Sequence, residues 1–150
     1  MKTFPETIVD GEGIRYSIYL AGCKHRCKGC QNPKSWNPEY GVPFTEKLLQ
    51  KIISEILSNP ILDGITLSGG DPFYNPEELL ILAKRLKEET KMNIWCYTGY
   101  TYEEITANED LSKVLPYLDV LVDGPYIIEL NDPEIRFRGS KNQRIIKLQK

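Results

Sequence analysis

Short apolar segments with strand character alternate with segments of helical periodicity along most of this sequence. Strands are predicted at 15–21, 64–67, 93–97 and 118–122, with a further one at 144–148. Helices are predicted from Thr45 to about Asn59, from Asn75 to about Thr90, and in two short stretches near Tyr102 and Leu111. Because strands that alternate with helices form parallel sheets with right-handed crossovers, the pattern predicts an α/β fold.

The length of the chain limits how far such a sheet can close. The 150 residues are predicted to form one domain, 1–150, whereas a closed eight-unit barrel typically needs about 250 residues. The expected architecture is therefore an open, partial (β/α) barrel of parallel strands. Ligands bind at the carboxyl ends of parallel strands, so we expect one active-site face there, with the open side available to a partner.

Charge and hydropathy exclude two classes of partner. The formal net charge is -2, from 19 basic and 21 acidic residues that are mixed along the chain, so no basic field is available to bind nucleic acid. No apolar run approaches the roughly 20 residues that span a bilayer. Residues 1–13 lack the features of a signal peptide. We expect a cytoplasmic protein that binds neither nucleic acid nor membrane.

Three of the four cysteines lie within eight residues. Cys23, Cys27 and Cys30 form a C-x3-C-x2-C set in a loop rich in glycine and basic residues. This spacing lets one loop enclose a compact 4Fe-4S cluster, and nearby cations and amides favour thiolates over thiols. Three protein ligands leave one of four irons open to a small molecule.

Other interpretations of these cysteines remain open. A zinc site could use the three cysteines with His25, although structural zinc usually takes ligand pairs from separated segments. Disulfides are the minority interpretation, because such a cluster in a reducing compartment more often holds a metal. His25, the only histidine, is expected near the cluster sulfurs. Cys96, inside a predicted strand, is interpreted as a small buried residue and not as a ligand.

The segment Ser68-Gly69-Gly70-Asp71-Pro72 follows the second predicted strand. Paired glycines let a ligand approach the backbone closely, and the Asp71 carboxylate can accept from a cationic amino group. Strand-to-helix turns often contain such residues, so the segment is informative mainly because it comes one strand after the cysteine loop.

Together these residues resemble the radical S-adenosylmethionine enzymes. Residues 10–15, with the sequence D-G-E-G-I-R, are similar to a segment of the glycyl-radical-enzyme activases. The segments 95–100, 122–125 and 136–144 resemble one subfamily, the activating proteins of anaerobic ribonucleoside-triphosphate reductase. Gly29 before the last cysteine and Asp71 after the glycines depart from the wider superfamily but are usual in that subfamily.

The resemblance implies a cofactor and a reaction. S-adenosylmethionine would bind the open iron of a 4Fe-4S cluster held by Cys23, Cys27 and Cys30. One electron from a reductase or flavodoxin would then cleave it to methionine and a 5'-deoxyadenosyl radical, which would abstract hydrogen from a glycine in the large subunit of the reductase. The residues expected to bind S-adenosylmethionine are Gly29, Cys30, Gln31, Gly69, Gly70 and Asp71, and those expected to line the entrance for the partner are Asp10, Arg15, Asp123 and Arg138.

Three alternative functions follow from the same residues. The chain could act on another glycyl-radical enzyme, or on a small molecule as 7-carboxy-7-deazaguanine synthase does, although that enzyme has a longer gap between its first two cysteines. It could also be a zinc- or cluster-stabilised binding module without enzymatic activity. Metal analysis separates the module from the enzymes, because the first would hold zinc and the second iron with labile sulfide.

Overall fold

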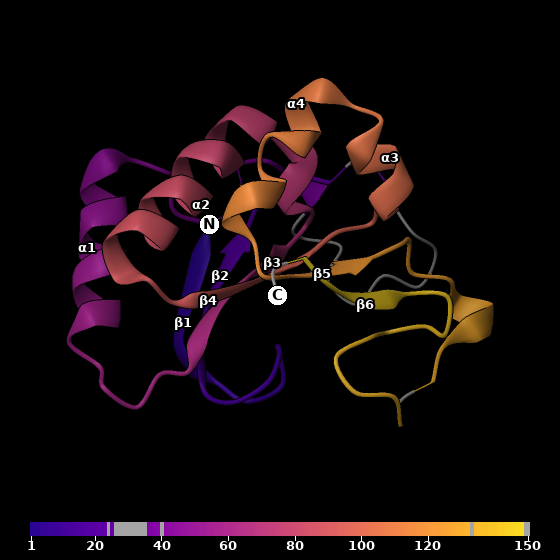
Figure 1. Cartoon of the computed structure of the whole chain (residues 1–150), viewed down its shortest axis with the longest axis horizontal. Helices are drawn as coiled ribbons and strands as arrows, with labels where there is room; N and C mark the ends of the chain where they lie inside the picture. Colours follow the sequence, from indigo (N-terminus) through magenta and orange to yellow (C-terminus); the bar gives the residue numbers. More distant parts are fainter. Residues whose placement is uncertain (24, 26–35, 40, 133, 149–150) are drawn as a thin grey trace.

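The protein folds into one mixed sheet with its helices on one face (Figure 1). The structure, a computed structural model, describes residues 1–23, 25, 36–39, 41–132 and 134–148. Its six strands are β1 (Lys2–Thr7), β2 (Arg15–Leu20), β3 (Gly64–Gly69), β4 (Asn93–Tyr97), β5 (Val120–Asp123) and β6 (Arg144–Lys147).

The order of strands in the sheet is the order of strands in the chain, β1-β2-β3-β4-β5-β6. Strands β2 to β5 pair in parallel, as expected. The prediction that all strands are parallel is wrong at both edges, where β1 pairs with β2 and β6 pairs with β5 in antiparallel fashion. The short 3-10 turn η4 (Ile128–Leu130) is the only helical element between β5 and β6 in the described chain, so no helical crossover returns β6 in the parallel direction.

Strand β1 was not predicted from the sequence. It contains Pro5, and most of its residues are exposed, so it shows neither an apolar run nor a clean alternation. Its register with β2 shifts between Phe4 and Thr7, on either side of the proline. Proline is tolerated in an edge strand because its missing N–H is not needed by a second neighbour.

The predicted helices are confirmed. Helix α1 (Glu46–Leu57) begins after Thr45, whose side chain accepts a hydrogen bond from Leu48 N, and α2 (Pro76–Thr90) begins after Asn75, whose side chain accepts from Glu78 N. Two short helices, α3 (Tyr102–Thr106) and α4 (Glu109–Ser112), follow β4. The remaining 3-10 turns are η2 (Pro72–Tyr74) and η3 (Leu115–Tyr117).

The two faces of the sheet differ in what covers them. Tyr16, Ile18 and Leu20 of β2 belong to the main core, together with apolar residues of α1 and α2. Successive strand residues point to opposite faces, so Arg15, Ser17 and Tyr19 point to the face without helices. On that face Trp95, Val120 and Val122 form a second, smaller cluster with Tyr97 and Phe137.

The sheet does not close into a barrel. Strands β1 and β6 are its two free edges in the described chain, so the predictions of an α/β class and of an open sheet are confirmed. None of the helices in the described residues has the length and apolar character needed to cross a membrane.

Candidate metal and cofactor site

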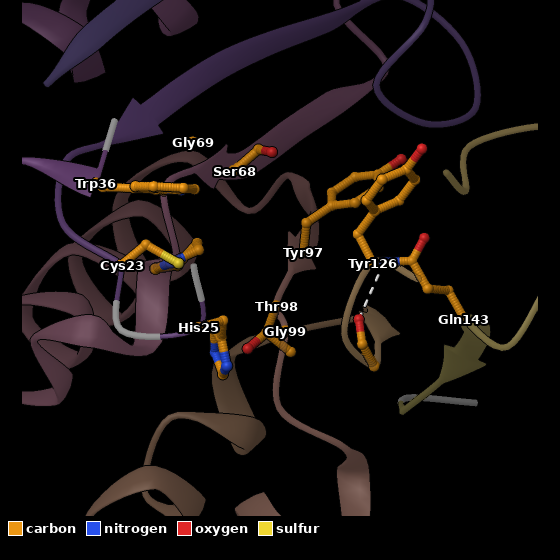
Figure 2. Close-up of a pocket in the computed structure, with 13 residues that line it drawn as sticks. Cys23, His25, Trp36, Ser68, Gly69, Tyr97, Thr98, Gly99, Tyr126 and Gln143 are labelled. Carbon is orange, nitrogen blue, oxygen red and sulfur yellow. Dashed lines mark hydrogen bonds between the residues drawn. The ribbon is translucent and has the colours of Figure 1, made fainter. Parts of the chain in front are cut away.

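One cavity lies where the parallel strands β2, β3 and β4 end (Figure 2). It brings together the described part of the cysteine loop, the glycine segment after β3 and the turn after β4, as the sequence predicted for the carboxyl ends of the strands. Its described lining consists of Cys23, His25, Trp36, Ser68, Gly69, Gly70, Pro72, Tyr97, Thr98, Gly99, Gly124, Tyr126 and Gln143.

Cys23 is the predicted ligand whose position the structure describes. It follows β2 after Gly22, is 8% exposed and lines the cavity. Gly22 has a φ of +101°, and a Cβ there would lie 2.5 Å from the ring of Tyr74, so the turn that presents Cys23 favours glycine. Cys27, Gly29, Cys30 and Gln31 lie outside the described residues, and their roles stay predictions.

The glycine segment is fixed directly to the start of the cysteine loop. Gly70 N donates to Leu20 O at 2.8 Å, and Asp71 N donates to Gly22 O at 2.8 Å. Gly69 has a φ of +108°, and a Cβ at this position would lie 2.3 Å from Leu20 O. Because only glycine permits this close approach, the predicted association of the two motifs has a specific backbone basis.

The Asp71 carboxylate connects three segments of the site. It is 1% exposed. Its Oδ1 accepts from Phe73 N and from the Thr98 hydroxyl, both at 2.9 Å. Its Oδ2 accepts from Gly99 N at 2.9 Å and lies 2.6 Å from His25 Nε2. The carboxylate therefore holds the cysteine loop, through His25, against the end of β4.

This arrangement changes how Asp71 can contribute to ligand binding. The sequence predicted an acceptor for a cationic amino group, whereas both carboxylate oxygens are bonded to groups of the protein. Asp71 thus stabilises the walls of the cavity in the described structure. The partners His25, Thr98 and Gly99 were not predicted, and the one indication in the sequence was that Thr98-Gly99 follows the next parallel strand.

His25 lines the same cavity as Cys23 (Figure 2), and its position near a cluster stays a prediction. The hydrogen bond to Asp71 raises the pKa of His25 against the effect of burial, and the negative charges of Asp71 and Glu104 act in the same direction as that bond. The Tyr100 ring contacts the imidazole edge-on, with 4.7 Å between centroids. The imidazole is therefore fixed from two sides.

The four residues predicted for the partner entrance do not lie together. Arg15, at the start of β2, is 2% exposed. Its guanidinium donates to the Thr66 hydroxyl, to Glu12 O, to Ile65 O, and to both the carbonyl and side-chain oxygens of Asn93. Burial lowers the pKa of Arg15 to about 10, so it stays charged at neutral pH. It lies at the amino end of the strands, opposite Cys23.

Asp10 lies near Arg15, because the Thr66 hydroxyl accepts from Arg15 and donates to Asp10 O, whereas Asp123 and Arg138 bond to the adjacent residues 144 and 143. The Asp10 carboxylate accepts from the Tyr19 hydroxyl at 2.9 Å, on the face of the sheet without helices. Asp123 is fully buried and accepts from Tyr102 N, at the start of α3, and from Arg144 Nε. Arg138 donates to Gln143 O, within the segment between β5 and β6.

The described lining suits a cluster ligand next to a backbone-lined subsite. It offers one thiol and four glycines, and the buried Asp71 carboxylate behind it is already bonded to His25 and Gly99. The cavity has a volume of about 140 Å³, below the roughly 300 Å³ at the small end of organic-ligand pockets. The described residues therefore accommodate only part of a nucleoside-sized ligand. No group of three or more potential metal-ligating His, Cys, Asp or Glu residues occurs within the described part of the chain.

Comparisons with known proteins bear directly on the nature of the metal. Residues 9–146 match a family described as a 4Fe-4S single cluster domain. The match covers most of the chain and includes all three clustered cysteines. It supports an iron-sulfur cluster over the zinc alternative.

Relatives of similar length carry one common name. The chain is 42% identical, over 97% of its length and 95% of the relative's, to the anaerobic ribonucleoside-triphosphate reductase-activating protein of Haemophilus influenzae. It is 38% identical to the protein of that name from Escherichia coli K12, covering 93% of this chain and 92% of the relative. The protein of that name from Enterobacteria phage T4 is 37% identical, covering 96% and 90%.

Proposed function

This chain belongs to the family of anaerobic ribonucleoside-triphosphate reductase-activating proteins, and we propose that it activates such a reductase by generating a glycyl radical on the large subunit. The open sheet is proposed to be a shortened radical S-adenosylmethionine barrel. A 4Fe-4S cluster bound at the cavity would supply one electron to S-adenosylmethionine, which would be cleaved to methionine and a 5'-deoxyadenosyl radical.

Different residues of the chain would bind the cluster and S-adenosylmethionine. Cys23, Cys27 and Cys30 would hold the cluster. The backbone of Gly69 and Gly70 would contact the amino group of S-adenosylmethionine, beside Asp71, and Gly29 to Gln31 would contact its nucleoside. The target glycine would lose one hydrogen atom from its α-carbon and keep the unpaired electron, and the hydrogen atom would end on 5'-deoxyadenosine.

The observation that carries this proposal is the shared position of Cys23, Gly69 and Gly70 around one cavity. Two motifs between which α1 and most of β3 lie in the sequence are fixed to each other by backbone hydrogen bonds. Asp71 further fixes His25 and the end of β4. Bound ligands and the partner would have to close this cavity to keep a reactive species away from bulk water.

The partner would approach from the face of the sheet that carries no helices. Asp10 and Arg138 remain our proposals for residues at this entrance, because both are half-buried and Asp10 lies on this face. Arg15 and Asp123 are bonded within the fold, so any effect on the partner would come through neighbouring residues. A flavodoxin-type electron donor and a cytoplasmic location complete the proposal.

Anaerobic reconstitution with iron and sulfide tests the function. The reconstituted protein, reduced in the presence of S-adenosylmethionine, should form 5'-deoxyadenosine. With the large subunit of the reductase added, a glycine-centred doublet should appear by electron paramagnetic resonance. Cys23→Ala should abolish both products.

Cys96→Ala is the matched control, because Cys96 is fully buried on the helix side of β4 and outside the cavity. It should retain iron, sulfide and product formation. A colourless protein that holds zinc, or product formation that survives Cys23→Ala, would refute the proposal.

A further inference from the structure

The hydroxyl of Tyr97 is a buried polar group without a partner in the described part of the chain. Tyr97 ends β4, and its side chain lines the cavity beside Thr98 and Gly99. Its oxygen is shielded from solvent and has no hydrogen-bond partner among the residues that the structure describes. A buried hydroxyl without a partner is costly, so such a group is expected to be satisfied by something that binds.

The position of the ring indicates which ligand could reach the hydroxyl. Figure 2 shows the ring extending from the end of β4 away from Cys23 and His25, on the side of the cavity where Tyr126 and Gln143 lie. On the same face of the sheet, Tyr97 packs against the cluster of Trp95, Val120 and Val122. The hydroxyl is thus directed away from the cysteine loop, toward the face through which we propose that the partner enters.

The phenol stays protonated at physiological pH. Burial raises the pKa of Tyr97, Asp10 and Tyr19 act in the same direction, and only the positive charge of Arg15 opposes them. The group is therefore a neutral O–H that can donate one hydrogen bond. It can donate to an acceptor such as a carbonyl oxygen, and its own oxygen can accept from an N–H group.

A target glycine has no side chain by which it could be recognised. Its position in a site must therefore be set by contacts to backbone groups of its own segment, and a peptide carbonyl is the acceptor that every such segment offers. We propose that the Tyr97 hydroxyl donates to a peptide carbonyl of the reductase segment that carries the target glycine, and so positions that segment. This inference rests on the proposed function.

The hydroxyl is covered in the isolated chain, so binding must displace side chains on this side of the cavity. Tyr126 is half-buried there, in the segment between β5 and β6. The partner segment would replace it next to Tyr97 and supply the missing acceptor.

Tyr97→Phe tests this role, because it removes only the hydroxyl. The half-saturating concentration of reductase for formation of the glycine-centred doublet should rise about 3- to 10-fold, the effect of losing one neutral hydrogen bond. Direct binding of the purified large subunit to the cluster-loaded protein should weaken by the same factor. The thermal midpoint of the variant without the reductase should be unchanged or higher, since the hydroxyl has no hydrogen bond to any residue that the structure describes.

Tyr117→Phe, on the helix side and away from the cavity, is the control and should bind the reductase as the wild type does. Unchanged reductase binding by Tyr97→Phe would overturn the inference. A lower thermal midpoint would overturn it as well, because it would assign the hydroxyl a structural partner. Absence of a glycyl radical with the wild-type protein would instead refute the proposed function itself.

Discussion

Asp71 is the residue on which most of the site's internal hydrogen bonds converge. Asp71→Asn replaces one acceptor oxygen with a donor that faces Gly99 N, the Thr98 hydroxyl or His25, depending on its orientation. Because hydrogen bonds to a buried charged group are worth more than neutral ones, the free energy of unfolding should fall by about 2–4 kcal/mol. Iron bound after reconstitution should also fall.

Asp63→Asn is the matched control for this change. Asp63 is exposed, lies at the opposite end of the strands and accepts from Ile14 N. Asp63→Asn should lower the free energy of unfolding by less than about 1 kcal/mol and leave the iron content unchanged. Chemical denaturation and iron analysis measure both quantities, and equal effects of the two variants would contradict the anchoring role of Asp71.

Arg15 distinguishes a structural residue from an entrance residue. Arg15→Lys retains the charge but provides three donors from one atom, whereas the guanidinium reaches five oxygens on β3, on β4 and in the segment before β2. The variant should lose about 2 kcal/mol, which lowers the midpoint of a domain of this size by about 4–8 °C. An unchanged thermal midpoint with weaker reductase binding would instead support the predicted role at the entrance.

Two glycines with positive φ at the ends of strands allow the cost of backbone strain to be measured apart from the cost of steric crowding. Gly69 is the last residue of β3 and Gly124 follows β5, with φ of +108° and +98°. A Cβ at Gly124 would meet no atom closer than 3.6 Å, whereas a Cβ at Gly69 would lie 2.3 Å from Leu20 O. Gly124→Ala should lower the free energy of unfolding by about 1 kcal/mol, from backbone strain alone. Gly69→Ala should cost at least about twice as much.

The second measurement for this pair is iron content. Gly69→Ala should lower it, because the added methyl group separates β3 from the end of β2, which carries the cysteine loop. Gly124→Ala should retain the wild-type content. Similar losses of stability and iron in both variants would contradict the role of close backbone approach.

Elements that are fixed by local chemistry could be predicted from the sequence. The N-caps Thr45 and Asn75 and the buried runs of β3 and β4 mark their own boundaries. Strand β1 could not be predicted, because an exposed edge strand with a proline has no distinctive pattern. The direction of β6 depends on how the segment after β5 returns, which is a property of the tertiary fold.

The site, like the fold, could be predicted only in part from the sequence. The position of Gly69 and Gly70 beside Cys23 follows from where parallel strands end. The bonds from Asp71 to His25, Thr98 and Gly99 were not foreseen, because they join residues up to 46 positions apart whose side chains carry no spacing rule. The different environments of Arg15 and Asp123 could not be predicted either, because their partners are also distant in the sequence.

At the scale of the whole molecule, the main core does not depend on the metal. Among the described residues, none between 21 and 43 belongs to the main hydrophobic cluster. Removal of iron by a chelator should therefore leave a folded protein with unchanged far-ultraviolet circular dichroism and a cooperative thermal transition, unlike a zinc finger, which unfolds without its metal. Loss of the cooperative transition in the apoprotein would show that the cluster is part of the core.

The coincidence of strand order and chain order has a consequence for biosynthesis. Each new strand can add to the edge left by its predecessor as the polypeptide leaves the ribosome. The start of the cysteine loop emerges early, but Gly70 and Asp71, which bond to it, and Gly99, which bonds to Asp71, are translated much later. The hydrogen bonds that join His25, Asp71 and Gly99 can therefore form only after about two-thirds of the chain has been made.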